Sequence, residues 1–121
     1  MTYICSRLFL HMDWRMKEMF EVNGKSYKLH YTEGRLELIE NKIGKSVVSD
    51  FIKSDGALPI ATIKSHFAFA LVCEDDPDVF VKPKDGMAVA SEYMKQHGYA
   101  SACDLIATSL ESDMGFLFRA N

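Results

Sequence analysis

The chain has 121 residues, of which 48% are hydrophobic, 26% charged and 12% aromatic. This length suits a single domain, and the hydrophobic share excludes a disordered or low-complexity protein. Fourteen Lys and Arg against seventeen Asp and Glu give a net charge of −3, which argues against binding driven by nucleic-acid phosphates. No apolar run approaches the roughly 18 residues of a transmembrane helix, so no membrane partner is expected.

The first segment, Met1–Glu18, has no sustained period of either a strand or a helix. Two interpretations stay open. In the first, it is a translated leader: Trp14-Arg15 can be encoded by TGGAGG, a ribosome-binding purine run, and the natural protein begins at Met19. In the second, it is an amphipathic arm that packs on the domain or on a neighbouring subunit.

A β-hairpin is predicted directly after Met19. Two segments of alternating hydrophobicity, Phe20–Val22 and Tyr27–Tyr31, flank Asn23-Gly24. This dipeptide is the strongest short-range hairpin signal, because both residues tolerate the positive φ of a type I′ turn. One apolar face is expected, formed by Phe20, Val22, Tyr27, Leu29 and Tyr31.

About five short helices are predicted after the hairpin. The first is capped by Thr32 and ends at Gly44, a residue suited to the left-handed conformation. The second is capped by Ser46 and stops at Ser54–Gly56. The third starts near Pro59 and continues through Val72. Its stripe of Ile60, Ile63, Phe67 and Leu71 predicts the centre of the core.

The second half is predicted to contain a loop, a short extended piece and two more helices. The acidic run Glu74–Asp78 is expected to be a solvated loop, followed by the extended piece Val79–Val81. A fourth helix is expected over Lys84–His97, with Gly98 as its stop. Ser101 and Asp104 resemble a capping box that opens a fifth helix.

The predicted fold class is therefore α+β and mostly helical. An N-terminal β-hairpin packs on a bundle of about five short helices, and residues 19–121 form a single compact domain. A lone hairpin is only marginally stable, so its apolar face has to lie on the helices.

The sequence nominates no catalytic, cofactor-binding or metal-binding residues. His66, Cys73, His97 and Cys103 lack the short spacing of zinc ligands. Gly24-Lys25-Ser26 and Gly44-Lys45-Ser46 resemble the end of a phosphate-binding loop but lack its first glycine. The three cysteines, Cys5, Cys73 and Cys103, are odd in number and lie in no CxxC motif, which favours reduced thiols and a cytoplasmic protein. We expect no enzyme and no cofactor.

A DNA-binding regulator is the alternative function. The two helices around Gly98, over residues 84–111, are superficially like a helix-turn-helix. However, Ser101–Asp113 contains no Lys or Arg and carries Asp104 and Glu111. Negative charge on the helix that would enter the major groove opposes binding to phosphates, so no nucleic acid is expected as a partner.

Protein–protein contact is the function that the apolar segments favour. The hairpin edge and the C-terminal tail are predicted to bind a partner, with self-association through the same surfaces as a second option. In a competing interpretation, the tail folds back on the core. The predicted contact residues are Tyr27, Leu29, Tyr31, Phe116, Leu117 and Phe118.

The pattern of structural residues resembles that of tail assembly chaperones of long-tailed bacteriophages. The resemblance rests on Met19–Leu29 and Leu36–Ser46, with its "IE…GKS" helix, and extends over Pro59–Leu71 and Glu74–Pro77. It implies a non-enzymatic protein of the host cytoplasm. Such a protein binds the tape measure protein during tail morphogenesis, and a longer frameshifted form is common in this group. Met1–Glu18 has no counterpart in that pattern.

Overall fold

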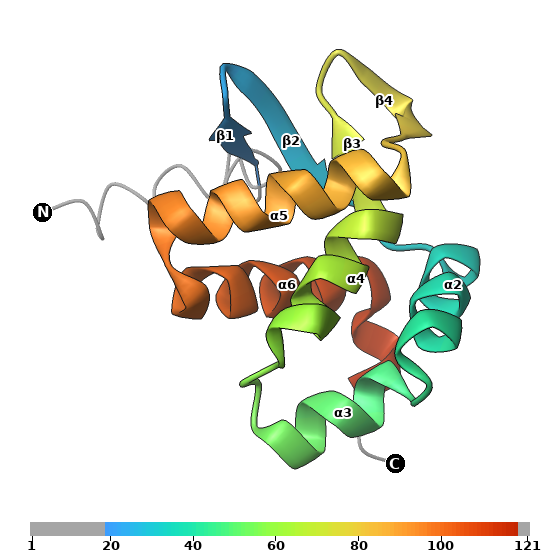
Figure 1. Ribbon diagram of the computed structural model, residues 1–121. Coiled ribbons are helices and arrows are strands. Elements are labelled where there is room, and N and C mark those ends of the chain that lie inside the picture. Colours follow the sequence, from blue (N-terminus) through green and yellow to red (C-terminus); the bar gives the residue numbers. More distant parts are fainter. Residues whose placement is uncertain (1–18, 119–121) are drawn as a thin grey trace, which may run out of the picture.

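The computed structural model describes residues 19–118 of the chain. The leader and arm hypotheses for Met1–Glu18, and the expectation for Cys5, therefore lie outside the described residues. Figure 1 shows a small sheet above a group of helices. The elements are β1 (Phe20–Val22), β2 (Lys25–Leu29), α2 (Glu33–Ile43), α3 (Val47–Ser54), α4 (Ile60–Ala70), β3 (Leu71–Cys73), β4 (Asp76–Phe80), α5 (Pro83–His97), α6 (Tyr99–Met114) and the 3₁₀ helix η2 (Gly115–Phe118).

The α+β, mostly helical fold class is confirmed, including the N-terminal hairpin. Strands β1 and β2 pair antiparallel with Phe20 opposite Tyr27 and Val22 opposite Lys25. Asn23 and Gly24 form the turn with φ of 54° and 82°, as a two-residue hairpin connection requires. Val22, Leu29 and Tyr31 are all buried, so the predicted face does point into the core.

The sheet is larger than predicted, because the hairpin is joined by two further strands. The strand order is β1-β2-β3-β4, and Leu29 of β2 pairs with Leu71 of β3. The expected third helix was wrong at its end: it stops at Ala70, and Leu71–Cys73 is a strand. A short uncharged apolar run fits a buried helix or a buried strand equally well. Pairing with β2, distant in sequence, decides between them.

The acidic segment is also partly a strand. Glu74 and Asp75 form a turn, and Asp76–Phe80 pairs with β3 beside an irregularity at Val72/Cys73. The predicted exposure is confirmed, because Glu74–Val79 is solvent-exposed throughout. The acidic segment was predicted to be a loop because Asp and Pro are rare in strands. They are tolerated here because β4 lies at the edge of the sheet.

Local capping signals placed most helix ends correctly. The Thr32 side chain accepts a hydrogen bond from the Arg35 amide, and Gly44 ends α2 with φ of 78°. Helix α3 is capped by Ser46. The predicted capping box of the last helix was wrong. Helix α6 starts at Tyr99 with no side-chain cap, because the chain turns directly from α5 into α6 at Gly98, whose φ is 95°.

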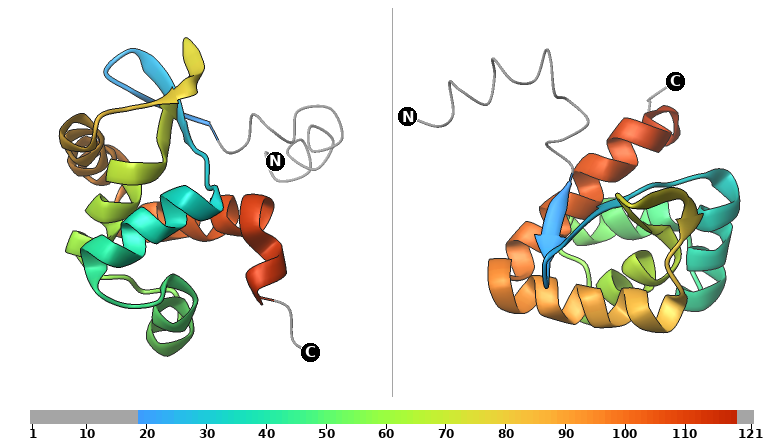
Figure 2. Two further views of the ribbon diagram at one scale, coloured as in Figure 1. Left: turned by 90° about the vertical axis from the view of Figure 1, so that its right-hand side faces the viewer. Right: turned by 90° about the horizontal axis from the view of Figure 1, so that it is seen from above.

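Helix α4 forms the centre of the core, as predicted. Ile63, Phe67 and Leu71 of the predicted stripe are fully buried, but the prediction for Ile60 was wrong, because it lies in the first turn of α4 and is 56% exposed. Helix α5 packs closely against α4. A Cβ atom at Gly86 of α5 would lie 2.4 Å from the Phe67 carbonyl oxygen, so only glycine fits this crossing. Figure 2 shows the sheet and α3 at opposite ends of the molecule, with α4 between them.

Over residues 19–118, none of the helices has both the length and the apolar character needed to cross a lipid bilayer.

Candidate protein-binding surface

The hairpin does not supply the predicted binding surface. Leu29 and Tyr31 are 0% and 2% exposed. They belong to the core, so their prediction as contact residues was wrong. Tyr27 is half-buried and stacks on Phe20, with ring centroids 6.0 Å apart. The open edge expected at β2 is also wrong, since β2 is paired on one side with β1 and on the other with β3.

The C-terminal tail agrees in part with each of its two interpretations, a partner-binding segment and a segment folded back on the core. Phe116 is 51% exposed, which agrees with a contact residue. Leu117 is half-buried and packs against the core, as the folded-back alternative predicts. The side chain of Phe118 lies outside the described residues.

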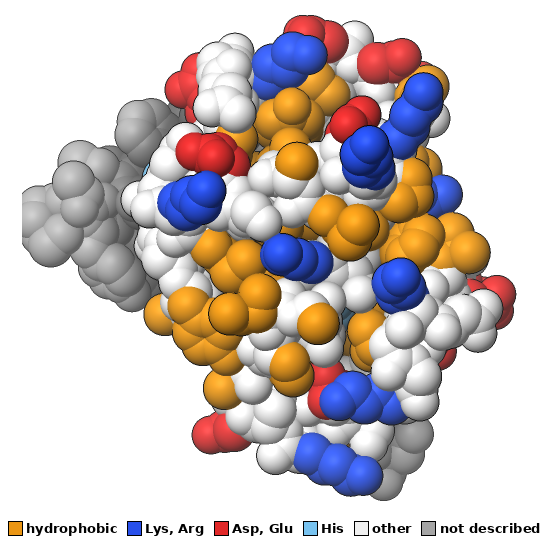
Figure 3. Space-filling model, viewed as in Figure 1, with side chains coloured by type: hydrophobic (Ala, Val, Ile, Leu, Met, Phe, Trp, Pro, Cys, Tyr) orange, Lys and Arg blue, Asp and Glu red, His pale blue; other side chains and the backbone are white. Residues whose placement is uncertain are grey.

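Apolar side chains reach the surface in several groups. Figure 3 shows hydrophobic side chains in separate patches between charged ones on one face of the molecule. The large exposed ones include Ile52 of α3 and Phe116 of η2. These two elements lie at the end of the molecule opposite the sheet (Figure 1).

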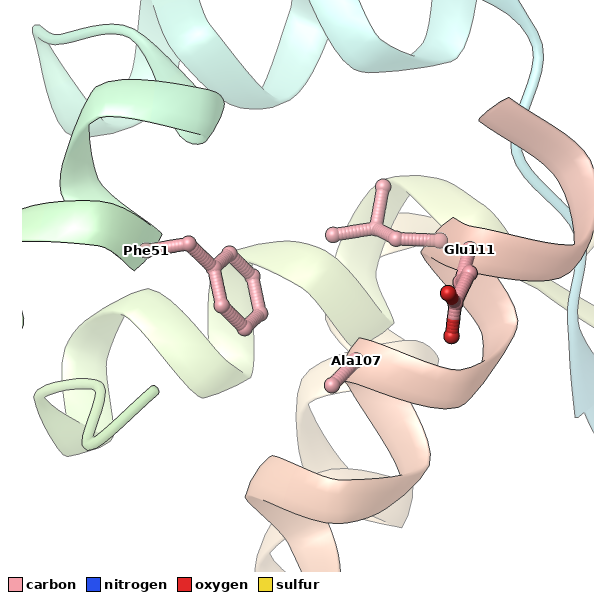
Figure 4. A pocket seen from close by; sticks show the side chains of 4 residues that line it. Phe51, Ala107 and Glu111 are labelled. Carbon is pink, nitrogen blue, oxygen red and sulfur yellow. The ribbon is translucent and has the colours of Figure 1, made fainter. Parts of the chain in front are cut away.

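A hollow of about 260 Å³ lies at this end, between α3 and α6. We call it the α3–α6 hollow. Figure 4 shows Phe51 reaching from α3 toward Ala107 and Glu111 on α6. Leu110, which is 1% exposed, also lines the hollow, whereas Ala107 and Glu111 are exposed.

The α6 side of the hollow follows from helical spacing. Ala107, Leu110 and Glu111 stand at positions i, i+3 and i+4, which share one face of a helix. The small side chain of Ala107 leaves the hollow open, and Glu111 puts a carboxylate beside it. Periodicity alone could place Leu110 on a buried stripe, but no local signal in the sequence shows that α3 lies opposite this face.

The α3 side of the hollow is held by polar contacts. The Ser46 hydroxyl accepts from the Ser49 amide at 3.2 Å, and the Val47 amide donates to Glu40 Oε2 at 2.9 Å. Lys45 Nζ lies 3.0 Å from Asp50 Oδ1. These contacts fix α3 at its first turn, so that Phe51 is presented toward α6.

A buried polar pair closes the core behind the hollow. The His66 ring packs edge-on against Phe51, with centroids 6.4 Å apart. His66 Nδ1 lies 2.8 Å from the Tyr31 hydroxyl. Burial lowers the pKa of His66 to about 4, and a weaker effect of the Asp50 charge opposes this. Burial also raises the pKa of Tyr31, so at neutral pH the pair consists of a neutral hydroxyl hydrogen-bonded to an uncharged imidazole.

Asp113, in the last turn of α6, connects the end of this helix to the segment that follows β2. Its Oδ2 atom accepts a hydrogen bond from the Tyr31 amide at 2.8 Å, and the His30 Nδ1 atom lies 3.7 Å away. This contact holds the last turn of α6 against the segment between β2 and α2. The 3₁₀ helix η2, which carries Phe116, follows directly after this turn.

The side chains of the described residues also bear on metal binding and DNA binding. Within the described range, residues 19–118, no three His, Cys, Asp or Glu side chains are grouped so that they could hold a metal ion. The helix pair expected for DNA binding does form as α5 and α6. Helix α6 nevertheless carries Asp104, Glu111 and Asp113 and no Lys or Arg, a charge that opposes contact with phosphates.

Neither a protein-family model, nor a curated protein, nor a solved structure matches this chain.

Proposed function

We propose that the protein is a non-enzymatic tail assembly chaperone of a bacteriophage or prophage. In this role it binds apolar helices of the tape measure protein in the host cytoplasm while the tail is assembled. The α3–α6 hollow is the observation that carries the proposal, and the sequence pattern of Met19–Pro77 supports it.

The lining of the hollow suits apolar side chains of a protein partner. Phe51 and the buried Leu110 line a space of about 260 Å³ between two helices. A helix that lies across α3 and α6 can insert apolar side chains between Phe51 and Leu110, which is the helix-in-groove mode of recognition. A long helical polymer such as a tape measure protein offers many such helices.

The charge beside the hollow specifies the partner further. Glu111 is exposed at the rim, and α6 has no positive side chain. A partner helix with Lys or Arg beside its apolar stripe therefore fits better than an acidic one, because like charges across an interface are unfavourable. Phe116, which is 51% exposed, follows shortly after α6 in η2 and adds a further exposed apolar side chain.

Co-purification tests the proposal. The protein is co-expressed with a tape measure protein, and capture and solubility of that protein are measured. Ala107→Trp fills the hollow without removing a core side chain, and we expect about tenfold weaker capture, equivalent to about 1.4 kcal/mol.

Ala88→Trp is the matched control. Ala88 is an exposed alanine on α5, outside the hollow, so capture is expected to be unchanged. The proposal is wrong if the wild-type protein captures nothing and normal tails form after deletion of its gene. If Ala107→Trp changes only the oligomeric state measured by light scattering, the hollow serves self-association instead.

A further inference from the structure

A second concave surface, of about 540 Å³, lies between α2 and β4 and reaches the start of α5. We call it the α2–β4 groove. On the right of Figure 3, where the start of α5 lies near α2, hydrophobic side chains adjoin those of Lys or Arg. Leu38 and Val79 in the groove are 40% and 57% exposed. The lining side chains used below are Arg35, Leu38, Phe69, Asp78, Val79 and Phe80.

Arg35 is held in one orientation inside this groove. Its Nε atom donates to the Phe69 carbonyl oxygen at 2.5 Å. The centre of its guanidinium group lies 4.0 Å from the centroid of the Phe80 ring, a cation–π contact. The two contacts fix the plane of the guanidinium group before any ligand arrives, which reduces the entropy lost when a carboxylate binds.

The positive charge of Arg35 has no carboxylate partner in the described part of the chain. The ion pairs found among residues 19–118 are His30–Asp113 and Lys45–Asp50. Asp78 lines the same groove without pairing with Arg35. Partial burial lowers the pKa of Arg35, as expected for a cation that has lost water without gaining a negative neighbour.

The neighbouring sheet edge is unsuited to a partner strand. Strand β4 is the last strand of the sheet, but it contains Pro77, which has no amide hydrogen to donate, between Asp76 and Asp78. Proline and charged residues are the devices that prevent edge-to-edge pairing. The groove is therefore better suited to a helix than to an added strand.

We propose that the α2–β4 groove binds an amphipathic helix of a partner polypeptide, in which a Glu or Asp lies between apolar side chains. The carboxylate pairs with Arg35, and the apolar side chains cover Leu38 and Val79. This surface is formed by other elements than the α3–α6 hollow, so the inference does not depend on the proposed chaperone function.

A random library of 16-residue peptides displayed on particles tests the inference. The library is selected on the immobilised full chain, and selected peptides are synthesised for affinity measurement. We expect enriched peptides with an acidic residue flanked by apolar residues. Replacing that Glu by Gln, or Asp by Asn, in the peptide should weaken binding about tenfold or more, because a charge-assisted hydrogen bond is lost.

Two protein variants locate the binding site. Leu38→Glu places a negative charge in the groove and should abolish binding, whereas Ile52→Glu makes a comparable change at an exposed aliphatic residue of α3 and should leave it unchanged. Arg35→Gln should weaken binding of the original peptide by the same factor as the Glu-to-Gln or Asp-to-Asn replacement in the peptide. The peptide substitution decides the question even where Arg35→Gln fails to fold.

Each other result overturns the inference. No enrichment above an unrelated protein of the same size would show that the groove has no such affinity. Enriched peptides without an acidic residue would remove the role of Arg35. Binding that survives Leu38→Glu but is lost in Ala107→Trp would place the peptide in the α3–α6 hollow instead.

Discussion

Helices α3 and α4 follow one another in the chain but are held in different ways. Seven of the eleven residues of α4 are buried, although it has no side-chain cap. Only two of the eight residues of α3 are buried, and it is capped at its start by Ser46. Helix α4 is thus stabilised by tertiary packing, and α3 largely by local hydrogen bonds. The packed helix gives the domain its stability, and the capped helix forms one wall of the proposed binding surface.

The largest effect is expected from truncating the centre of α4. Phe67→Ala should lower the free energy of unfolding by about 3–5 kcal/mol, because it removes a fully buried ring and leaves a cavity. Phe51→Ala removes the same ring from the half-buried α3 side of the hollow and should cost roughly half as much or less. Urea denaturation measures both. Equal losses would contradict the contrast between the two helices.

Acid should lower the stability of the protein through His66, a buried residue of α4. Its pKa in the folded protein is about 4, below the unfolded value of about 6.5. The unfolded state therefore binds the proton first as the pH falls. Stability should decrease between about pH 6.5 and pH 4, by about 3 kcal/mol in total.

A double variant isolates this contribution. Tyr31→Phe with His66→Leu removes the titrating ring and its partner together, leaving no buried hydroxyl unpaired. The fall in stability over this pH window should then become shallower than in the wild-type protein. If the wild-type and double variant lose stability in parallel, carboxylates and not His66 account for the acid sensitivity.

The contact between α4 and α5 should tolerate no side chain at Gly86. Gly86→Ala is expected to cost about 1–3 kcal/mol through overpacking, because the added methyl group meets the Phe67 carbonyl oxygen. Gly34→Ala on α2 meets nothing within 4 Å and should be neutral or stabilising by up to about 1 kcal/mol. Thermal unfolding of the pair checks this, and a neutral Gly86→Ala would show that the helices are less closely packed.

The smallest effect is expected at the cap of α3. Ser46→Ala should cost about 1 kcal/mol by removing the hydrogen bond to the Ser49 amide. Ser112→Ala, at an exposed position on α6, provides the control. Native-state hydrogen exchange should quicken in α3 while α4 stays unchanged. Faster exchange in α4 as well would mean that the two helices unfold together.

Local signals in the sequence predicted much of this fold. Asn23-Gly24 placed the hairpin, Thr32 and Ser46 placed two helix starts, and Gly44 placed a helix end. In each case a single residue type supplies a conformation or a hydrogen bond that few others can, so the signal is readable without tertiary context. The prediction failed at Leu71–Cys73, where an apolar segment carries no such marker and pairing with β2 decides its conformation.

The proposed binding surface could be predicted only in part. Phe116 was expected to be a contact residue from its apolar surroundings and is exposed. Leu29 and Tyr31 were nominated because the hairpin edge was expected to be open. They are buried, because their side chains belong to the apolar face that packs into the core. Phe51 and Ala107 were missed as a pair, since 56 residues separate them along the chain.

The sequence by itself determined where the hairpin turns, where α2 and α3 begin, where α2 and α5 end, and that Ile63 and Phe67 belong to the core. These features depend on backbone conformation and periodicity within a few residues. Only the tertiary structure decided that the sheet has four strands, that α3 faces α6 across a hollow, and that Arg35 lies over Phe80 without a carboxylate partner among the described residues. These features depend on contacts between distant segments, which form only when the whole core is packed.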